Sequence, residues 1–479
     1  MAYNSLEEFV QVLQRDGELK RIAHPVKAEL EITEIANRVM KSNGPALLFE
    51  NVVGKNVPVL INAFGSTKRM AMALGVNDVE DIAREIEKLL QMMRPPKSFK
   101  DKLHLLSDAI RLAGIPPKKV KEGACQEVIH REPDLGILPV LTCWPGDGGP
   151  FITLPMVFSK DPNRGTRNVG LYRMQVYDSR TTGMHWHLHK VGARHYRQQQ
   201  TRRMELAVCI GGDPALTYAA TAPLPDQIDE ILFTGFIHKK GVKLVKGITV
   251  DIEVPASADF VIEGYVDPSE PYRREGPFGD HTGFYSLADD YPVFHVTCIT
   301  QRIKPIYLTT IVGRPPMEDA YIGKATERIF LPLLKLTFPE IVDMNLPVHG
   351  VFHNLAIISI KKEFPAHARK IMHALWGMGQ MMFTKTLIVV DHDVNVQDLS
   401  EVTWVVSNHI DPKQDVIFVD GPVDVLDHAA PIMGFGSKVG IDATRKWRSE
   451  GFEREWPGAI VMDEKTKKYV DSIWKKLGI

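Results

Sequence analysis

Long apolar runs and paired cysteines are missing from this sequence of 479 residues. No apolar run approaches the roughly 18 residues that a membrane-spanning helix needs, so we expect no such span. The four cysteines, Cys125, Cys143, Cys209 and Cys298, are far apart and form no Cys-x-x-Cys pair. Their spacing indicates neither a disulfide framework nor a thiolate metal site.

The chain also lacks an excess of charge of either sign. Lys plus Arg total 58 against 59 for Asp plus Glu, so the formal net charge is −1. A nucleic-acid-binding protein would carry a strong basic excess, and we therefore expect no nucleic-acid partner. Residues 1–9 lack the basic and apolar segments of a secretory signal. The composition, 44% hydrophobic and 24% charged, is typical of globular chains and predicts a soluble, cytoplasmic protein.

The apolar pattern divides the chain into three predicted domains. Residues 1–115 alternate amphipathic helices with short apolar runs, which indicates an N-terminal α/β domain. Residues 116–316 contain strand-like runs separated by turns rich in Gly, Pro and Asp, as in a β-barrel or sandwich. Residues 317–479 alternate helix and strand again, which predicts a C-terminal α/β domain with a terminal helix. The predicted fold class is therefore multi-domain α+β.

Several elements are predicted individually. Ser5 and Glu8 have the spacing of a capping box, and the helix that they begin is expected to stop at Gly17. Further helices are expected over 32–40, 79–93, 325–336 and 366–378, and strands over 152–158, 169–176, 206–210, 260–262, 293–299, 355–360 and 386–390. The glycine-rich run 434–440 lacks the Walker spacing and is interpreted as a surface turn.

Two carboxylates stand close together in the segment EGPFGDH at 275–281. Glycines and a proline favour a tight loop, so Glu275 and Asp280 can converge on one pocket. Carboxylates paired in a partly dry site have their pKa values pushed apart, and one of them can stay protonated and act as an acid. The alternative is an ordinary acidic turn that pairs with Arg273 and Arg274.

An arginine lies in the strand-like segment NVGLYRMQ at 168–175. Alternate side chains of a strand share a face, so Arg173 and Gln175 point the same way. A buried guanidinium needs an anion, and its fork geometry suits a carboxylate. A purely structural Arg–Glu pair is the alternative. Asn168 adds an amide oxygen, a hard ligand suited to Mg²⁺ or Mn²⁺.

Three histidines alternate in the segment MHWHLHK at 184–190. If this segment is a strand, His185, His187 and His189 lie on one face, an arrangement that can bind Zn²⁺, Fe²⁺ or Mn²⁺. The alternative is that they are structural histidines. A hydrolase or oxygenase built on this triplet is a competing chemical hypothesis.

Taken in order, these segments resemble the UbiD family of decarboxylases. The matching segments are NVGLYRMQ at 168–175, HLHKVGARHY at 187–196, DIEVPAS at 251–257, EGPFGDHTG at 275–283, GRPPMED at 313–319 and GSKVGIDAT at 436–444. The resemblance implies that the central domain is a split β-barrel that binds prenylated FMN, with Mn²⁺, often joined by K⁺, at the flavin phosphate. It also implies homo-oligomers, commonly dimers or hexamers, joined through the C-terminal domain.

The resemblance also assigns site residues. The implied metal ligands are Asn168, His189 and Glu230. The implied cofactor-binding residues are Leu171, Tyr172, Arg173, His185, Trp186, His187, Lys190, Val191 and Lys385. The implied catalytic residues are Glu275, Arg173 and Asp280. From the residues alone, Lys385 stays undecided between capping a helix and contacting an anion.

These assignments imply reversible, non-oxidative decarboxylation of an aromatic or α,β-unsaturated acid. Loss of CO₂ leaves a carbanion that no side chain can stabilise, so a cofactor must carry the charge. Asp280 would deliver the proton after burial raises its pKa from about 3.9, with Arg173 and Glu275 as partners. Mn²⁺ would neutralise the flavin phosphate rather than activate water.

The resemblance is strongest to bacterial 3-polyprenyl-4-hydroxybenzoate decarboxylases, which implies a role in ubiquinone biosynthesis or a smaller hydroxybenzoate as substrate. A flavin prenyltransferase would supply the cofactor, and a polyprenylated substrate would bring the protein to the membrane surface. Two alternatives stay open. One is a metal-dependent hydrolase that uses His185, His187 and His189, and the other is a non-catalytic subunit of a carboxylase complex.

Overall fold

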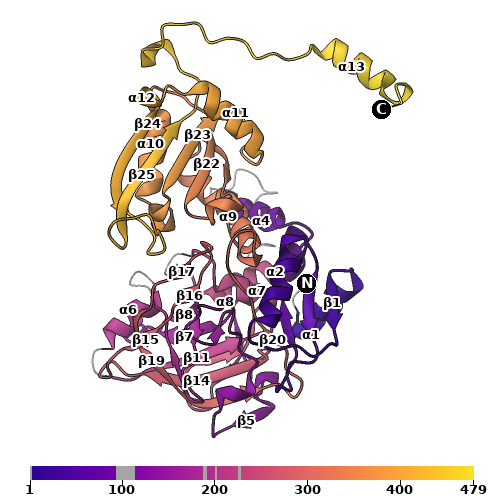
Figure 1. Cartoon of the computed structure of the whole chain (residues 1–479), viewed down its shortest axis with the longest axis vertical. Coiled ribbons are helices and arrows are strands. Elements are labelled where there is room, and N and C mark those ends of the chain that lie inside the picture. Colours follow the sequence, from indigo (N-terminus) through magenta and orange to yellow (C-terminus); the bar gives the residue numbers. More distant parts are fainter. Residues whose placement is uncertain (1–2, 93–113, 187–190, 200–201, 225–227, 479) are drawn as a thin grey trace.

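The computed structural model describes residues 3–92, 114–186, 191–199, 202–224 and 228–478. Figure 1 shows a central region below, an N-terminal region at its side and a C-terminal lobe above, with helix α9 (Glu318–Thr337) between the central region and the lobe. We use "C-terminal lobe" for residues 341–442. None of the described helices is both long and apolar enough to cross a membrane.

The N-terminal region packs helices against a small mixed sheet. Ser5 begins its first helix, because its side chain accepts a hydrogen bond from the backbone N–H of Glu8 at 3.2 Å. The sheet has the order β1-β2-β3-β20, and its last strand, β20 (Tyr307–Leu308), comes from the end of the central region. The two regions therefore share one sheet. The other elements are α1 (Leu6–Arg15), β1 (Leu19–Ile22), α2 (Glu31–Lys41), β2 (Ala46–Phe49), β3 (Val59–Ile61), α3 (Thr67–Ala73) and α4 (Glu80–Met92).

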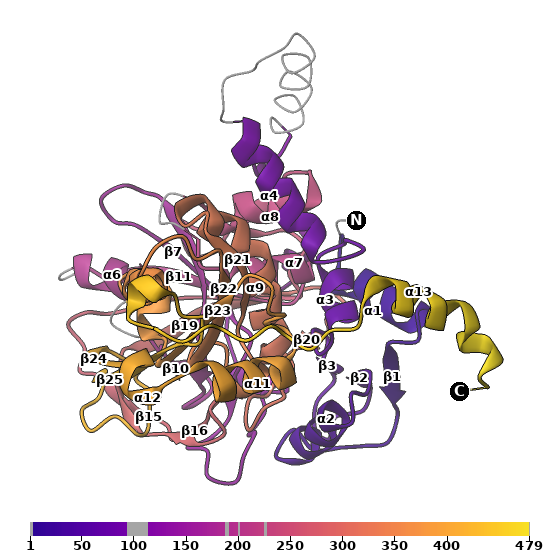
Figure 2. The ribbon, with the colours of Figure 1, turned by 90° about the horizontal axis from the view of Figure 1, so that it is seen from above.

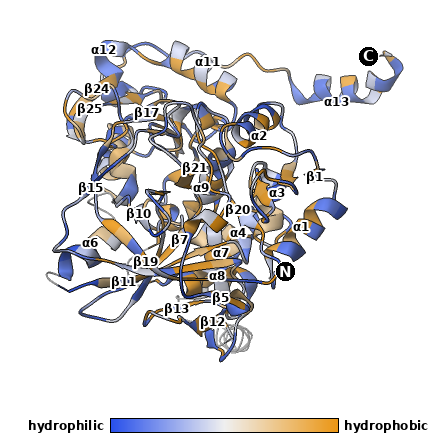
Figure 3. Cartoon of the chain, turned by 60° about the horizontal axis from the view of Figure 1, so that its bottom comes forward, coloured by the Kyte–Doolittle hydropathy of each residue, from blue (hydrophilic) through white to orange (hydrophobic). Residues whose placement is uncertain are grey.

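The central region is built on an antiparallel sheet in the order β10-β19-β14-β11-β7-β8, with β5 paired to β19. Figure 3 shows these strands largely in the colour of apolar residues. Apolar side chains fill two separate clusters of buried residues on this sheet, so its strands are covered on both faces. The strands are β5 (Val128–His130), β7 (Met156–Lys160), β8 (Arg167–Leu171), β10 (Thr181–Gly183), β11 (Met204–Ile210), β14 (Phe260–Val266) and β19 (Val293–Gln301).

Short hairpins and helices surround this sheet, and they carry most of the polar residues discussed below. The paired strands are β6 (Phe151–Ile152) with β9 (Met174–Gln175), β15 (Arg273–Glu275) with β18 (Asp289–Tyr291), and β16 (Phe278–Gly279) with β17 (Tyr285–Ser286). A further sheet joins β13 (Glu253–Pro255), β12 (Lys243–Lys246) and β4 (Lys118–Lys119). The helices are α6 (Val191–Gln198), α7 (Pro214–Ala219) and α8 (Glu230–His238).

The C-terminal lobe is a sheet in the order β21-β22-β23-β25-β24, with helices on its faces. Its strands are β21 (Ile341–Asn345), β22 (Leu355–Ile360), β23 (Thr386–Asp391), β24 (Val416–Pro422) and β25 (Phe435–Asp442). Its helices are α10 (His367–Trp376), α11 (Leu399–His409) and α12 (Pro412–Asp415). Beyond the lobe the chain forms an extended arm that ends in α13 (Glu464–Ile473), which stands apart from the body in Figure 1; Figure 2, seen from above, shows the arm running toward the side of the molecule where α1 lies.

Most sequence-predicted elements are confirmed within a few residues, but the interpretation of 434–440 as a surface turn is wrong. Residues 435–442 form β25, an internal strand between β23 and β24. A Cβ atom at Gly440 would lie 2.6 Å from Sδ of Met372 on α10. The glycine therefore allows α10 to pack closely on the sheet. A local sequence pattern cannot distinguish a glycine that serves such packing from a glycine that serves a turn.

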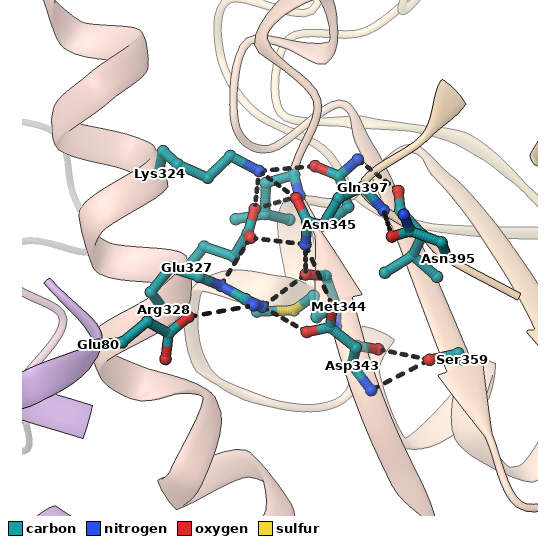
Figure 4. A network of polar contacts seen from close by, with 12 residues as sticks. Glu80, Lys324, Glu327, Arg328, Asp343, Met344, Asn345, Ser359, Asn395 and Gln397 are labelled. Atoms are coloured by element: carbon teal, nitrogen blue, oxygen red, sulfur yellow. Dashed lines mark hydrogen bonds and ion pairs between the residues drawn. The ribbon is translucent and has the colours of Figure 1, made fainter. Parts of the chain in front are cut away.

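A polar network joins α9 to the lobe and to the N-terminal region (Figure 4). The side chain of Glu327 is fully buried and pairs with Lys324 at 2.6 Å and Arg328 at 3.0 Å. Arg328 also pairs with Asp343 on β21 at 2.5 Å and with Glu80 on α4 at 3.4 Å. Three parts of the chain that are distant in sequence thus meet at the guanidinium of Arg328, which the buried carboxylate of Glu327 also contacts.

We expect Glu327→Ala to lower the free energy of unfolding by about 3–5 kcal/mol, because it leaves buried cations without their anion. Glu34→Ala is the matched control. Glu34 pairs with Arg38 on an exposed helix face, and such a pair contributes less than about 1 kcal/mol. Urea unfolding followed by circular dichroism measures both. Equal losses in the two variants would contradict a structural role for the buried network.

Candidate active site

Arg173 is the centre of a cluster in which the predicted catalytic residues meet. Its Nε donates to Oε1 of Glu275 at 3.2 Å, and its Nη2 donates to Oγ of Ser286 at 3.0 Å. Its Nη1 donates to Oδ2 of Asp280. The expected convergence of the two carboxylates is therefore present, and one guanidinium joins them.

The loop that carries the carboxylates is fixed on several sides. Gln175, two residues after Arg173, accepts a hydrogen bond from the backbone N–H of Gly276 at 2.7 Å. Asp147 accepts one from the N–H of Gly279 at 2.8 Å. The ring of Phe278 lies under the guanidinium, with its centroid 4.6 Å from Cζ of Arg173. The ionic groups thus occupy set positions in a nearly dry site.

The charge state of Asp280 differs from the sequence-based expectation. Burial raises the pKa of its carboxyl, but a hydrogen bond from His281 and the positive charges of His281 and Arg173 outweigh burial and hold this pKa well below its usual range. The expectation that burial would raise the pKa of Asp280 is therefore wrong, because the site that removes its water also supplies two cationic partners. Asp280 is an anion in this arrangement.

The sequence left open whether 184–189 is a strand, and residues 184–186, the described part of this segment, are not in one. Strand β10 ends at Gly183, and the backbone N–H of Trp186 donates to the carbonyl of Met184 at 2.9 Å in a turn. Nδ1 of His185 lies 2.9 Å from Oε2 of Glu275, and its ring lies 4.3 Å from that of Tyr291. His185 thus contacts the carboxylate cluster through its Nδ1.

The other members of the histidine triplet, His187 and His189, lie outside the described residues, as does Lys190. In the part of the chain that the structure describes, no group of three or more His, Cys, Asp or Glu side chains could hold a metal ion. Of the triplet on which the hydrolase hypothesis depends, the described residues therefore include His185 alone.

The remaining implied metal ligands lie together. Asn168 is on β8, and Glu230 is the first residue of α8 and accepts a hydrogen bond from the N–H of Val169 at 2.9 Å. Burial raises the pKa of Glu230 to about 7. The neighbouring Asp229 instead pairs with Arg167 at 2.6 Å. Glu230 is therefore a partly buried carboxyl whose ionisation would be favoured by a cation.

Two buried donors beside this carboxyl lack a partner among the described residues. They are Nδ2 of Asn168 and Nε1 of Trp186. The phenol of Tyr172 lies beside the Asn168 amide, and its ring meets that of Trp186 edge-on at 6.4 Å. Buried polar groups in folded proteins are nearly always paired, so each of these donors needs a partner that the described residues do not include. We use "wall" for the surface formed by Asn168, Tyr172, Trp186 and Glu230.

Glycines make this wall compact. A Cβ atom at Gly170 would lie 2.2 Å from the phenol oxygen of Tyr172, and one at Gly192 would lie 2.7 Å from Nε1 of Trp186. Leu171 ends β8 and Val191 begins α6, so both implied cofactor-binding residues border the same wall.

Lys385 lies in the C-terminal lobe, next to the start of β23. Its Nζ pairs with Oδ1 of Asp427 at 2.8 Å, so of the two alternatives it contacts an anion. The next residue, His428, has its Nε2 3.0 Å from Oγ1 of Thr282, and its ring lies 5.4 Å from that of Phe284. The loop that holds Lys385 thus meets the loop that follows Asp280.

Sequence reasoning missed a histidine pair at the same junction. His281 Nδ1 lies 2.8 Å from Oδ1 of Asp280, and its Nε2 lies 3.0 Å from Nε2 of His353 in the C-terminal lobe. The position of His281 directly after Asp280 was a usable signal. Nothing in the local sequence marks His353, because it reaches the site only through the packing of the lobe.

The fold and this site can be compared with known proteins. Models of the N-terminal, Rift-related and C-terminal domains of 3-octaprenyl-4-hydroxybenzoate carboxy-lyase match residues 10–89, 118–315 and 320–443. An uncharacterized protein of Archaeoglobus fulgidus is 51% identical over 481 aligned residues, which span 100% of this chain and 99% of the relative.

Two solved structures are similar over nearly their whole length. The vanillic acid decarboxylase of Sedimentibacter hydroxybenzoicus in its closed form is 28% identical with a TM-score of 0.86, covering 100% of this chain and 99% of that one. The UbiD-class enzyme HmfF of Pelotomaculum thermopropionicum in complex with FMN is 31% identical with a TM-score of 0.79, covering 95% and 97%.

These similarities define a multi-domain α+β protein of the carboxy-lyase class. The chain belongs to the UbiD family of decarboxylases, as the resemblance of its sequence motifs implied.

We expect Arg173→Ala to lower the free energy of unfolding by about 3–5 kcal/mol at pH 8, because Glu275 and Asp280 lose their buried cation. The loss should be smaller at pH 5. A buried carboxyl that has lost a cation favours its neutral form, so folding of the variant takes up protons and its stability rises as the pH falls. The exposed Arg180, 3.8 Å from Glu132, is the control as Arg180→Ala. Equal losses at both pH values, measured by urea unfolding, would disprove the electrostatic cause.

Proposed function

We propose that this protein is a reversible, non-oxidative decarboxylase of an aromatic or α,β-unsaturated carboxylic acid that uses prenylated FMN. The observation that carries the proposal is the cluster of Arg173, Glu275 and Asp280 in a chain of the UbiD family. A buried guanidinium can orient a carboxylate, and an adjacent carboxyl can move a proton. Both tasks belong to decarboxylation.

The residues present fit the cofactor. The unpartnered donors of Asn168 and Trp186 lie at a buried wall where a polar group of a flavin would satisfy them. We infer that this wall, within a central sheet that forms a split β-barrel, holds prenylated FMN together with Tyr172, His187, Lys190 and Val191. When bound, this cofactor supplies the electron sink that decarboxylation needs.

A cation would complete the same wall. Glu230 and Asn168 offer oxygen ligands of the kind that Mn²⁺ prefers, and we propose His189 as the third ligand. The raised pKa of Glu230 supports a cation here, because a buried carboxyl without a cation favours its neutral form. K⁺ would share this region, and Lys385 would contribute from the lobe.

Each charged residue then has its own task in the reaction. Arg173 orients the substrate carboxylate, and Glu275 holds Arg173 on one side and His185 on the other. Asp280 moves a proton to or from the carbon that bears the carboxylate. The same groups serve both directions, so the CO₂ concentration decides between decarboxylation and carboxylation.

The substrate class is proposed from the relatives. The Sedimentibacter neighbour is named for vanillic acid and the family models for an octaprenyl-hydroxybenzoate. We propose a hydroxybenzoate, either small or 3-polyprenylated. The polyprenylated substrate would imply a role in ubiquinone biosynthesis and contact with a membrane surface. A flavin prenyltransferase is the implied supplier of the cofactor.

We also propose a homo-oligomer, a dimer or a hexamer. The arm beyond the C-terminal lobe exposes large apolar side chains, among them Val461, Met462, Tyr469 and Trp474. An evolved dimeric form of the neighbour HmfF is known. Burial of this apolar surface against a second copy would stabilise an assembly.

The function is tested with protein co-expressed with a flavin prenyltransferase. We expect the mass and absorbance of prenylated FMN in the purified protein, and CO₂ release from at least one acid among hydroxybenzoates, cinnamates and heteroaryl acids. Asp280→Asn should keep the flavin spectrum but lose about 10²–10⁴-fold in rate, since an amide cannot donate the proton. Asp290→Asn, on an exposed strand, is the control.

Two results would contradict this proposal. A colourless protein with bound zinc would indicate a hydrolase, and a holoenzyme that turns over none of these acids would indicate a non-catalytic subunit. Wild-type rates in Asp280→Asn would instead move the proton-donor role to Glu275.

For the metal, we expect Asn168→Ala and Glu230→Ala to reduce Mn²⁺ and flavin occupancy together. The ion and a phosphate oxygen would share one coordination sphere, so loss of a ligand weakens both. Metal analysis and flavin absorbance of the purified variants measure the two occupancies. Asp229→Asn is the comparison, because Asp229 pairs with Arg167. Full occupancy in Glu230→Ala with loss in Asp229→Asn would show that the ligand has been assigned to the wrong carboxylate.

A further inference from the structure

We propose that His281 holds the proton that recharges Asp280, and that His353 of the C-terminal lobe is a positioning residue that fixes this proton. The inference rests on the proposed decarboxylation. It assigns tasks to two side chains outside the cluster of Arg173, Glu275 and Asp280, and it makes the lobe part of the active site.

The evidence is a continuous row of short polar contacts. Oδ1 of Asp280 lies 2.8 Å from both the backbone N and the Nδ1 of His281. Nε2 of His281 lies 3.0 Å from Nε2 of His353. Nδ1 of His353 lies 3.1 Å from Oδ1 of Asn354. The row begins at the carboxylate beside Arg173 and ends in the C-terminal lobe.

The proton positions follow from which atoms can donate. The carbonyl oxygen of Asn354 only accepts, so the Nδ1 of His353 carries a proton. A neutral His353 then has a bare Nε2, which must accept from the Nε2–H of His281. The Nδ1 of His281 faces a carboxylate and is a donor as well. His281 is therefore an imidazolium between an anion and a neutral imidazole.

The charges around His281 favour the same state. Burial lowers the pKa of His281, but this effect is outweighed by the hydrogen bond and negative charge of Asp280. The negative charges of Asp319 on α9 and Asp424 after β24 raise this pKa further. Burial and the charge of His281 lower the pKa of His353, which keeps this ring neutral. The other groups that face this loop are Arg173, which contacts Oδ2 of Asp280, and His428, which contacts Thr282.

Decarboxylation consumes one proton for each CO₂ released, because R–COO⁻ + H⁺ gives R–H + CO₂. Asp280 rests as an anion beside Arg173 and His281, so in each turnover it needs a proton, which it passes on when its O–H bond breaks and the new C–H bond forms. Arg173 cannot supply it, since a guanidinium does not deprotonate in proteins. In His281 the Nδ1–H bond breaks and the Oδ1–H bond of Asp280 forms. The neutral ring of His281 keeps its Nε2–H, which still donates to Nε2 of His353. A proton from solvent then restores the imidazolium of His281.

The backbone before His353 is strained, and this strain accompanies the contact between His281 and His353. Val351 and Phe352 have φ values of 45° and 49°, which are unfavourable for non-glycine residues and most of all for a β-branched one. The Phe352 ring stacks on His281 at 5.1 Å, and a Cβ atom at Gly323 of α9 would lie 2.9 Å from Cβ of Phe352. This strained segment thus places the side chains of Phe352 and His353 in contact with His281.

The test compares His353→Ala with His349→Ala, which removes an exposed histidine from the same segment. In full-length protein with ¹³C-labelled histidine, the NMR signal of His281 is assigned by its loss in His281→Gln. We expect its titration midpoint to lie above 6.5 in the wild type, to fall by about one pH unit in His353→Ala and to stay unchanged in His349→Ala. His353→Gln should restore the midpoint, because its carbonyl can accept the Nε2–H.

The holoenzyme gives the second measurement, the pH profile of kcat. Activity should fall as the pH rises through the His281 midpoint. In His353→Ala this alkaline limb should move to lower pH by about one unit. At pH values above the limb, kcat should then be about tenfold lower than in the wild type, and KM should stay unchanged. An unchanged midpoint and limb in both His353 variants would overturn the inference. A wild type without turnover refutes the proposed function instead, and the NMR midpoint still decides the state of His281.

Discussion

The site depends on one constraint, which is that the guanidinium of Arg173 is largely removed from water. The side chain of Arg173 is 11% exposed, and a buried cation is stable only when anions and acceptors surround it. The loops that carry Glu275, Asp280 and Ser286 therefore have to close around it. Gln175 and Asp147 hold these loops through backbone N–H groups, so the ionic cluster and the short hairpins stabilise one another.

The two carboxylates that pair with Arg173 contact different parts of the fold. Glu275 binds His185, whose ring packs on Tyr291 within the central region. Asp280 binds His281, whose ring contacts His353 and Phe352 of the C-terminal lobe. Charge balance around one arginine thus couples two parts of the fold. The network around Glu327 joins the same lobe to α9 from another side, so the lobe is held where the site needs it.

Local sequence patterns predicted the elements well where the pattern and the packing agree. Strand β22 has the expected bounds, and α1 begins at its capping residue Ser5, because alternation and capping act over a few residues. The prediction was wrong at β25, where Gly440 serves a contact with Met372 on a distant helix. After β10 the sequence left the conformation of residues 184–189 open, and in the structure Nδ1 of His185 contacts Glu275.

The sequence by itself determined the fold class, the family and the residue types of the candidate site, because these follow from composition, periodicity and ordered motifs. Only the tertiary structure decided their charge states and partners. The pKa of Asp280 falls rather than rises because Arg173 and His281 meet its two oxygens in space. His353 joins them from 72 residues beyond His281. Desolvation and Coulomb energy depend on such through-space distances, which a local pattern does not contain.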